Sequence, residues 1–142
     1  MRHGHTLLEL TLALAVAGLA LGIALPRLVA VQDGLEVDRA AREVVIAHRR
    51  ARIAAILRSR PIVLSISPDS LAYRELGAAS RLWRAPGPAR GGVVLASPAR
   101  QITFSPVGIT LGLANASYRV LRGSSSRTVI VSRLGRVRVT RP

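Results

Sequence analysis

The sequence contains no cysteine among its 142 residues. Disulfide bonds and thiolate metal sites are therefore excluded, although this absence does not separate a cytoplasmic protein from a periplasmic one. Aromatic residues make up only 3% of the chain, whereas hydrophobic residues make up 49%. A core must therefore consist mainly of Val, Ile, Leu and Ala side chains, and deep aromatic pockets are not expected.

Lysine is also absent, so all 21 basic residues are arginine, against 7 acidic residues and a formal net charge of +14. The last carboxylate in the chain is Glu75, and eleven arginines follow it. The C-terminal half therefore presents charge of a single sign, which attracts polyanions such as nucleic acid or anionic lipid. The alternative is a solvated surface whose arginines bind no ligand.

The motifs of common enzymes are missing as well. No serine lies in Gly-x-Ser-x-Gly, no glycine-rich phosphate loop is present, and the acid-free C-terminal half lacks a general base. The three histidines are His3, His5 and His48, and only the first two are close enough in sequence to suggest a metal pair. We therefore expect no catalytic activity, no cofactor and no metal site.

One long apolar run is present near the N-terminus. Within residues 10–25 the only polar residue is Thr11, and one charged residue, Glu9, lies at the start of the run. As a helix rising about 1.5 Å per residue, residues 6–25 would span about 30 Å, the thickness of a bilayer core. We therefore predict one membrane-spanning helix.

A secretory signal peptide is the alternative reading of this segment. Arg2, the apolar run and Ala-Val-Ala at 15–17 match its basic, apolar and cleavage regions. Glu9 argues against it, because a carboxylate costs about 2.5–3.5 kcal/mol at the middle of a membrane and less near the interface. A residue of this cost indicates a function for Glu9 within the membrane segment.

The residues Gly4-His5-Thr6-Leu7-Leu8-Glu9, followed by the apolar helix, resemble the leader of type IV prepilins and secretion pseudopilins. The resemblance implies that a prepilin peptidase cleaves between Gly4 and His5 and that the new amino group on His5 is methylated. Glu9 is then the fifth mature residue and Pro26 the twenty-second, where many pilins have a helix-kinking proline. His5 departs from the family, which usually has Phe or Met at this position.

The resemblance also implies a role for Glu9 in assembly. The free amine of an adjacent mature subunit can neutralise this carboxylate in lipid, so the cost of the charge favours ordered addition of subunits. The expected partners are the prepilin peptidase, other pilins or pseudopilins in a filament, and the bacterial inner membrane. We expect a single-pass chain whose globular domain is periplasmic.

The helical pattern continues beyond Pro26 and stops at Pro61. We predict a helix of about 50 residues, bent at its internal proline, whose second half packs on a folded domain. One face of that second half combines the residues Val37, Ala41, Val44, His48, Ala51 and Ala55. The predicted organisation is a leader at 1–4, a transmembrane half-helix at 5–26, an amphipathic half-helix at 27–60 and a globular β domain at 61–142.

From Ile62 onwards the apolar residues alternate with polar ones, and turn residues separate the segments. The predicted strands are 62–67, 71–74, 82–84, 92–95, 101–104, 109–113, 117–121, 128–132 and 137–140. Their spacing is typical of an antiparallel sheet or sandwich. We therefore predict an α+β fold in which a long N-terminal helix precedes a small antiparallel β-sandwich.

This half of the chain is similar to the GspH/FimT branch of the pilin family, through residues 102–108 and 129–139. The similarity implies a GspH-like minor pseudopilin of a type II secretion system, assembled into a periplasmic pseudopilus that drives protein export. The alternative that it implies is a FimT-like minor type IV pilin that binds DNA for natural transformation. Such pilins use a Gly-Arg-x-Arg motif near the C-terminus, and residues 135–138 match it.

Arg136 and Arg138 are the main candidate DNA contacts. If Val137 points into the sheet, both arginines project from its other face and could hold successive phosphates without reading bases. Arg133 and Arg127 are further candidates. No aromatic residue interleaves these arginines, so binding would depend on the phosphate backbone and on salt. The alternative is a strand edge whose arginines discourage sheet-to-sheet aggregation.

Overall fold

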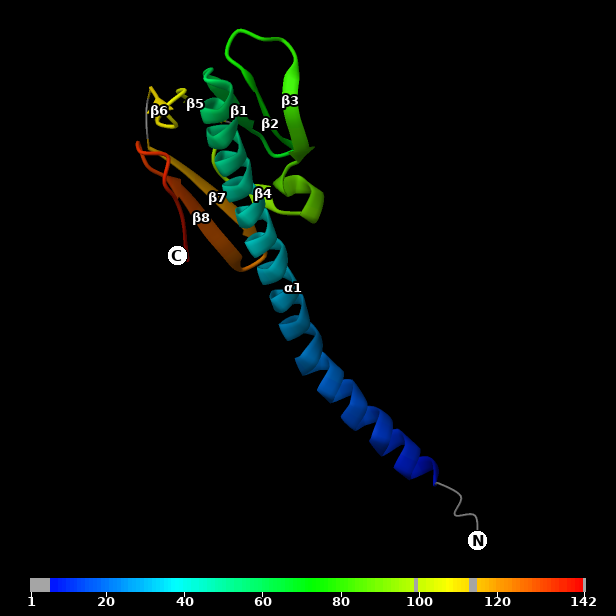
Figure 1. Ribbon diagram of the computed structural model, residues 1–142. Helices are drawn as coiled ribbons and strands as arrows, with labels where there is room; N and C mark the ends of the chain where they lie inside the picture. The colour runs from blue at the N-terminus through cyan, green and yellow to red at the C-terminus, as the bar shows by residue number, and fades with distance from the viewer. Residues whose placement is uncertain (1–5, 99, 113–114, 142) are drawn as a thin grey trace. The chain divides into compact units, whose positions relative to one another are not determined.

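The computed structural model describes residues 6–98, 100–112 and 115–141. The chain forms two compact units, one that ends at Gln32 and one that begins at Asp33. A single helix, α1 (Leu7–Arg58), runs through both units. Within the described residues, nine strands and the 3₁₀ helix η1 (Pro88–Gly91) follow it in the second unit (Figure 1).

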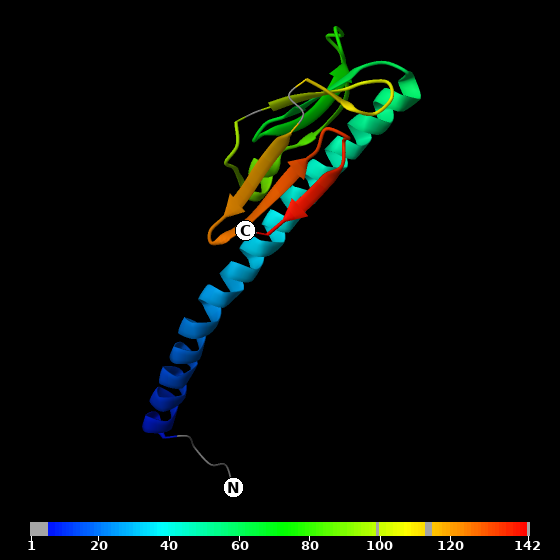
Figure 2. The same cartoon turned by 90° about the vertical axis from the view of Figure 1, so that its left-hand side faces the viewer.

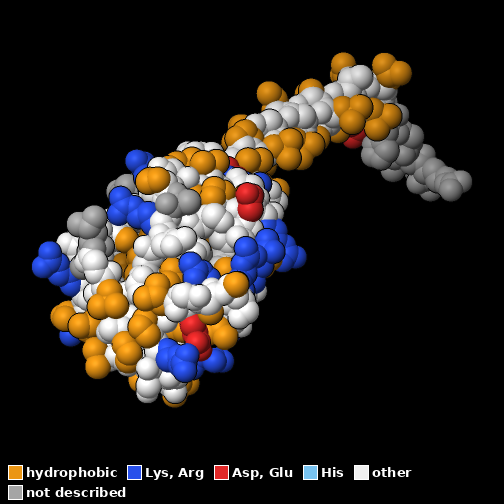
Figure 3. All heavy atoms as spheres, turned by 90° about the horizontal axis from the view of Figure 1, so that it is seen from above, with side chains coloured by type: hydrophobic (Ala, Val, Ile, Leu, Met, Phe, Trp, Pro, Cys, Tyr) orange, Lys and Arg blue, Asp and Glu red, His pale blue; other side chains and the backbone are white. Residues whose placement is uncertain are grey.

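In the first unit, every residue of α1 from 7 to 32 is exposed. This part of the helix is long and apolar enough to cross a membrane, and Figure 3 shows the apolar side chains that cover it. The helix continues through Pro26, which lies inside it. An apolar surface of this extent requires cover from lipid or from other protein chains.

In the second unit, one stripe of α1 is buried. The six residues that were predicted to form one face are all buried, and Ala40 and Ala47 extend the same stripe. Small side chains dominate the stripe, so the sheets can approach the helix closely. The helix ends at Arg58, close to Pro61, where the sequence predicted its end, and Ser59 after it adopts a left-handed conformation (φ 51°).

The strands form two antiparallel sheets (Figures 1 and 2). The five-stranded sheet has the order β3-β2-β1-β5-β6. Its strands are β1 (Ile62–Ile66), β2 (Ser70–Glu75), β3 (Arg81–Pro86), β5 (Arg100–Phe104) and β6 (Thr110–Leu111). The four-stranded sheet has the order β4-β7-β8-β9 and contains β4 (Val94–Leu95), β7 (Ala116–Arg122), β8 (Ser125–Val131) and β9 (Val137–Thr140). The predicted α+β fold is confirmed.

Some predicted strands differ in length in the structure, and one element was not predicted. The strand expected at 62–67 ends one residue earlier, and the strand expected at 92–95 is reduced to the two-residue strand β4. Of the strand expected at 109–113, the described residues form the two-residue strand β6, and residue 113 lies outside the described residues. The short helix η1 occupies the segment before β4, because Pro88 fixes a helical φ at its start and Gly92 ends it in a left-handed conformation (φ +67°).

Both sheets share one hydrophobic core with α1, and His48 lies in it. Its ring meets Phe104 of the five-stranded sheet edge-on, with centroids 6.0 Å apart, and Tyr118 of the four-stranded sheet at 5.6 Å. Among the described residues, neither ring nitrogen of His48 nor the Tyr118 hydroxyl has a hydrogen-bond partner. Burial lowers the pKa of His48 to about 4 and raises the pKa of Tyr118 to about 12, the latter against the opposing charge of Arg100.

The turn between β8 and β9 packs against the loop between β5 and β6. The carbonyl oxygen of Arg133 accepts hydrogen bonds from the backbone N–H and the hydroxyl of Thr110, at 3.3 and 3.0 Å. Gly135 (φ +71°) approaches the backbone so closely that a Cβ there would lie 3.1 Å from the carbonyl oxygen of Gly108. The two stretches that resemble the GspH/FimT branch therefore meet at this turn.

The burial of His48 predicts a loss of stability in acid. The unfolded chain, with a histidine pKa near 6.5, takes up a proton before the folded chain does, so stability is full above that pH and falls towards pH 4. The loss should reach roughly 3 kcal/mol. Urea unfolding of the full chain in detergent, followed by circular dichroism between pH 4 and 7, measures it.

A His48→Phe variant keeps a ring beside Phe104 and Tyr118 but cannot titrate. Its free energy of unfolding should fall less over the same pH range, because the phenyl ring takes up no proton. Equal pH slopes in the two proteins would contradict the assignment to His48.

The glycine contact at the β8–β9 turn predicts a specific cost for Gly135→Ala. A positive φ costs alanine about 1–2 kcal/mol, and the backbone contact should add about 1 kcal/mol or more. Gly77→Ala is the matched control, because Gly77 also has a positive φ (+84°) but a Cβ there would meet no atom within 4 Å. Equal losses of unfolding free energy in the two variants would show that the contact contributes nothing.

Candidate functional site

The N-terminal candidates belong to the first unit. Gly4 and His5 lie outside the described residues, so their cleavage and methylation stay predictions. Glu9 lies exposed in the first turn of α1, and its backbone N–H donates to the Thr6 hydroxyl oxygen at 3.3 Å. Thr6 and Glu9 have the spacing of a capping box, and an acid in this turn suits the helix dipole. Glu9 is therefore held on an ordered helical turn.

Arg138 lies on β9 of the four-stranded sheet, and Arg136 immediately precedes that strand. Both side chains are exposed, whereas Val137 between them is partly buried and packs against the core. In the β8–β9 register, Val137 is opposite the buried Val131 and Arg138 is opposite Ile130. Because alternate residues share one face of a strand, the two arginines lie on the outer face, and the condition set for Val137 is met.

Arg127 occupies a different environment. Its Nε lies 2.7 Å from Oδ1 of Asp38 on α1, its Nη1 donates to the carbonyl oxygen of Ser126 at 2.8 Å, and its side chain is only 15% exposed. This arginine fastens β8 to the helix. Its position favours a structural role over the DNA contact that was predicted from the sequence.

A second ion pair of the same kind joins β7 to α1. The Nε of Arg122 lies 2.8 Å from Oδ1 of Asp33, which is buried, and its Nη1 donates to the carbonyl oxygen of Gly91 at 2.6 Å. Neither ion pair was predicted from the sequence. The position of Asp33 could have indicated the pair that it forms, because Asp33 lies one helical turn before Val37 and therefore on the buried face of α1.

Arg119 is an exposed residue that was not among the predicted site residues. It lies between the buried residues Tyr118 and Val120 on β7, so its side chain points outward. It is opposite Thr128 on β8, which in turn is opposite Thr140 on β9. Alternation within the predicted strand 117–121 could have identified it.

We call three exposed arginines the outer arginine face: Arg119 on β7, Arg138 on β9, and Arg136, which immediately precedes β9. Arg133 is exposed in the adjacent turn between β8 and β9. On the side of the molecule drawn in Figure 3, arginine side chains are spread over the folded unit with few carboxylates among them. Such a surface attracts anionic partners.

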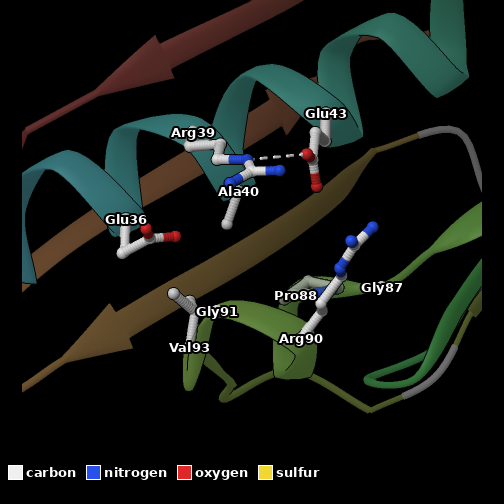
Figure 4. Close-up of a pocket in the computed structure, with 9 residues that line it drawn as sticks. All are labelled: Glu36, Arg39, Ala40, Glu43, Gly87, Pro88, Arg90, Gly91 and Val93. Atoms are coloured by element: carbon white, nitrogen blue, oxygen red, sulfur yellow. Dashed lines mark hydrogen bonds and ion pairs between the residues drawn. The ribbon is translucent and has the colours of Figure 1, made fainter.

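A small pocket lies between α1 and η1 (Figure 4). Its volume is about 140 Å³, and Nε of Arg39 lies 3.2 Å from a carboxylate oxygen of Glu43 at its rim. A Cβ on Gly91 would come within 2.6 Å of a carboxylate oxygen of Glu36, so glycine leaves that side chain its room. The described residues contain no cluster of three His, Asp or Glu side chains that could hold a metal. We assign no ligand to this pocket.

Comparisons with known proteins agree with this architecture. A family model described as type II transport protein GspH matches residues 40–135. The pilin-like protein PilA1 of Thermus thermophilus is 31% identical over 157 residues, which cover 97% of this chain and 98% of the relative.

Two crystal structures of the type IV minor pilin FimU from Pseudomonas aeruginosa share the fold. Their TM-scores are 0.64 and 0.61, at 19% and 18% sequence identity. The matches cover 74% and 72% of this chain and 88% and 91% of the FimU chains. The chain therefore belongs to the GspH family of type IV pilin-like proteins, which are structural filament subunits without catalytic activity.

Proposed function

We propose that the chain is a minor pseudopilin of a type II secretion system. It is anchored in a bacterial inner membrane by α1, its folded unit is periplasmic, and it joins a pseudopilus that drives protein export. The match of the GspH family model to most of the folded unit carries this proposal. The exposed apolar helix supports it, since residues 7–32 need cover first from lipid and later from neighbouring subunits.

Deletion of the gene tests the export function. Loss of folded proteins from the culture medium, with natural transformation unchanged, supports the secretion role. Unchanged export would contradict it and would favour the second candidate described below.

Assembly is assigned to the N-terminal residues. In this proposal, the prepilin peptidase cleaves after Gly4 and methylates His5, and the amine of one subunit meets the carboxylate of Glu9 in the next. Such a charge pair is strong where water is excluded, and it sets the register of each added subunit. Pro26 lacks the backbone N–H that would continue the helical hydrogen-bond ladder, so α1 can bend there to fit a filament.

We predict that Glu9→Gln lowers incorporation into filaments. The variant should insert and be cleaved, but its sedimented filament fraction should fall at least tenfold, because breaking a buried charge pair costs about 3–5 kcal/mol. Thr6→Ala is the control, since it removes the helix cap but keeps the carboxylate. A Glu9→Gln chain that enters filaments as well as the unchanged protein would argue against the assigned role.

DNA binding is the second candidate function, and the outer arginine face favours it. Arg136 and Arg138 lie two residues apart, or about 7 Å along a strand, and point to the same side. Guanidinium groups at this spacing can contact neighbouring phosphates of one backbone. The absence of any carboxylate after Glu75 leaves the attraction unopposed by acids in the same sheet.

We predict that a variant with Arg136→Ala and Arg138→Ala loses most of its affinity for duplex DNA. Removing two phosphate contacts should lower the dependence of log K on log salt by about 2, and Arg119→Ala should lower it by about 1 more. Fluorescence anisotropy of labelled duplex across a sodium chloride series, with the full chain in detergent, measures both quantities.

The matched control is a variant with Arg81→Ala and Arg84→Ala. It removes the same charge from exposed positions on β3, in the other sheet. An equal loss in this control would indicate attraction by net charge alone. No binding by the unchanged protein at low salt would exclude DNA as a ligand.

A further inference from the structure

Strand β3 forms one edge of the five-stranded sheet, next to β2 (Figure 1). Within the described residues, no strand pairs with the other side of β3. A strand at the edge of a sheet exposes backbone N–H and C=O groups that can pair with a further strand. The edge of β3 is therefore open to an added strand.

The register of β2 and β3 identifies which backbone groups point away from the sheet. The backbone N–H of Gly87 donates to the carbonyl oxygen of Asp69 at 3.0 Å, and these two residues are opposite each other at the end of the ladder. Hydrogen-bonded pairs recur at every second residue of an antiparallel ladder, so Ala85 and Trp83 bond to β2. Arg84 lies between them, and its N–H and C=O therefore point outward, towards the place of an added strand.

A partly apolar pocket lies beside the same edge, between β3 and α1. Its volume is about 160 Å³, and its apolar lining includes Ile46, Trp83 and Pro86. Trp83 points to the inner side of the sheet, because it is opposite Tyr73 and stacks on it, and both rings pack against the core. Trp83 is nevertheless only partly buried, and Ile46 is 46% exposed. An apolar side chain on the inner side of an added strand would fill this pocket.

The outer side of the same edge carries positive charge without acidic partners. Arg81 is opposite Arg74 and Arg84 is opposite Ala72, which places Arg81 and Arg84 on the outer side of the sheet. Both are exposed, and within the described residues neither forms an ion pair, although Asp69 lines the same shallow depression as Arg84. Carboxylates on the outer side of an added strand would lie next to these guanidinium groups.

We infer that the edge of β3 binds an extended segment of another protein in which apolar and acidic residues alternate. The segment adds a sixth strand to the five-stranded sheet. Its apolar residues enter the pocket beside Trp83, and its carboxylates pair with Arg81 and Arg84. The inference goes beyond the proposed function and does not depend on which filament contains the chain.

A second copy of this chain does not supply such a segment. Five of its seven acidic residues lie on the helix α1: Glu9, Asp33, Glu36, Asp38 and Glu43. Asp69 lies in the turn before β2, and Glu75 ends β2, which is an interior strand. The other edge strands, β4, β6 and β9, all follow Glu75 and contain no carboxylate. Two β3 edges would bring arginines together, and like charges on neighbouring strands are destabilising.

Nucleic acid also matches this edge poorly. Its phosphates could meet the two arginines, but a phosphate backbone does not present the alternating donors and acceptors that pair with a strand edge. Base stacking on Trp83 is hindered as well, because Tyr73 stacks on its ring and the guanidinium carbon of Arg50 lies 5.4 Å from the ring centroid. A peptide therefore fits the edge better than DNA does.

The probe for this site is a synthetic peptide in which valine and glutamate alternate over about eight residues. Fluorescence anisotropy of the labelled peptide measures its binding to the full chain in a neutral detergent. The affinity should fall by about tenfold or more in a variant with Arg81→Glu and Arg84→Glu, because like charges then meet across the strands. The same variant should bind a peptide in which arginine replaces glutamate.

Methylation of the peptide backbone separates strand pairing from simple attraction of charges. In an added strand, the amides at alternate positions face β3 and the others face solvent. N-methyl groups on one alternating set should therefore abolish binding, whereas N-methyl groups on the other set should leave the affinity nearly unchanged. Both methylated peptides carry the same charge, so equal effects of the two patterns would overturn the inference.

The matched control is a variant with Arg136→Glu and Arg138→Glu, which makes the same change of charge at the other sheet. Its affinity for the peptide should be nearly unchanged. A milder variant, Arg81→Gln with Arg84→Gln, should give an intermediate affinity and shows that the effect does not arise from misfolding. Equal losses in the two charge-reversed variants, no binding of the valine–glutamate peptide, or its displacement by duplex DNA would each overturn the inference.

The peptide measurement is independent of the export test. Binding at β3 would stand if deletion of the gene left export unchanged, because it is measured on the purified chain. If export is lost on deletion but the peptide does not bind, the secretion role stands and only the site at β3 is wrong.

Discussion

The packing of both sheets on one narrow stripe of α1 is the interaction on which the folded unit depends. Each sheet has an apolar face that would lie in water without the helix, and the core contains residues from all three elements. Alanine dominates the stripe, with Val37 and Val44 adding larger side chains. Because few aromatic residues are available, close approach and many small contacts provide the burial that stabilises the unit.

Two ion pairs form beside the buried stripe of α1, where the four-stranded sheet packs on the helix. Asp33 and Asp38 lie beside the buried stripe, and Arg122 and Arg127 reach them from β7 and β8. These pairs use two acids of the helix to fasten the four-stranded sheet, and their breakage would leave a charge in a partly dehydrated site. Because the chain has 21 arginines against 7 acidic residues, its surface carries an excess of positive charge.

Local patterns in the sequence were sufficient for much of the fold. The spacing of apolar residues and the positions of turn residues predicted α1 and the approximate position of each strand, because these signals come from residues that are close in sequence. The direction of the Arg127 side chain was not predicted, because residues 123–126 were interpreted as a loop. In the structure β8 begins at Ser125, and Arg127 lies on the inner side of this strand. The contact between Gly108 and Gly135 joins distant segments, so no local pattern could predict it.

The neighbours of each arginine in this chain determine what its side chain can do. Next to a carboxylate on the buried side of α1, it fastens a sheet, as Arg127 does with Asp38. Among hydroxyl side chains on a strand, it presents a hydrated cation that suits phosphate. Between isoleucines on a helix, its planar and weakly hydrated guanidinium can enter an apolar contact and pair with a carboxylate there, which a strongly hydrated lysine does less well.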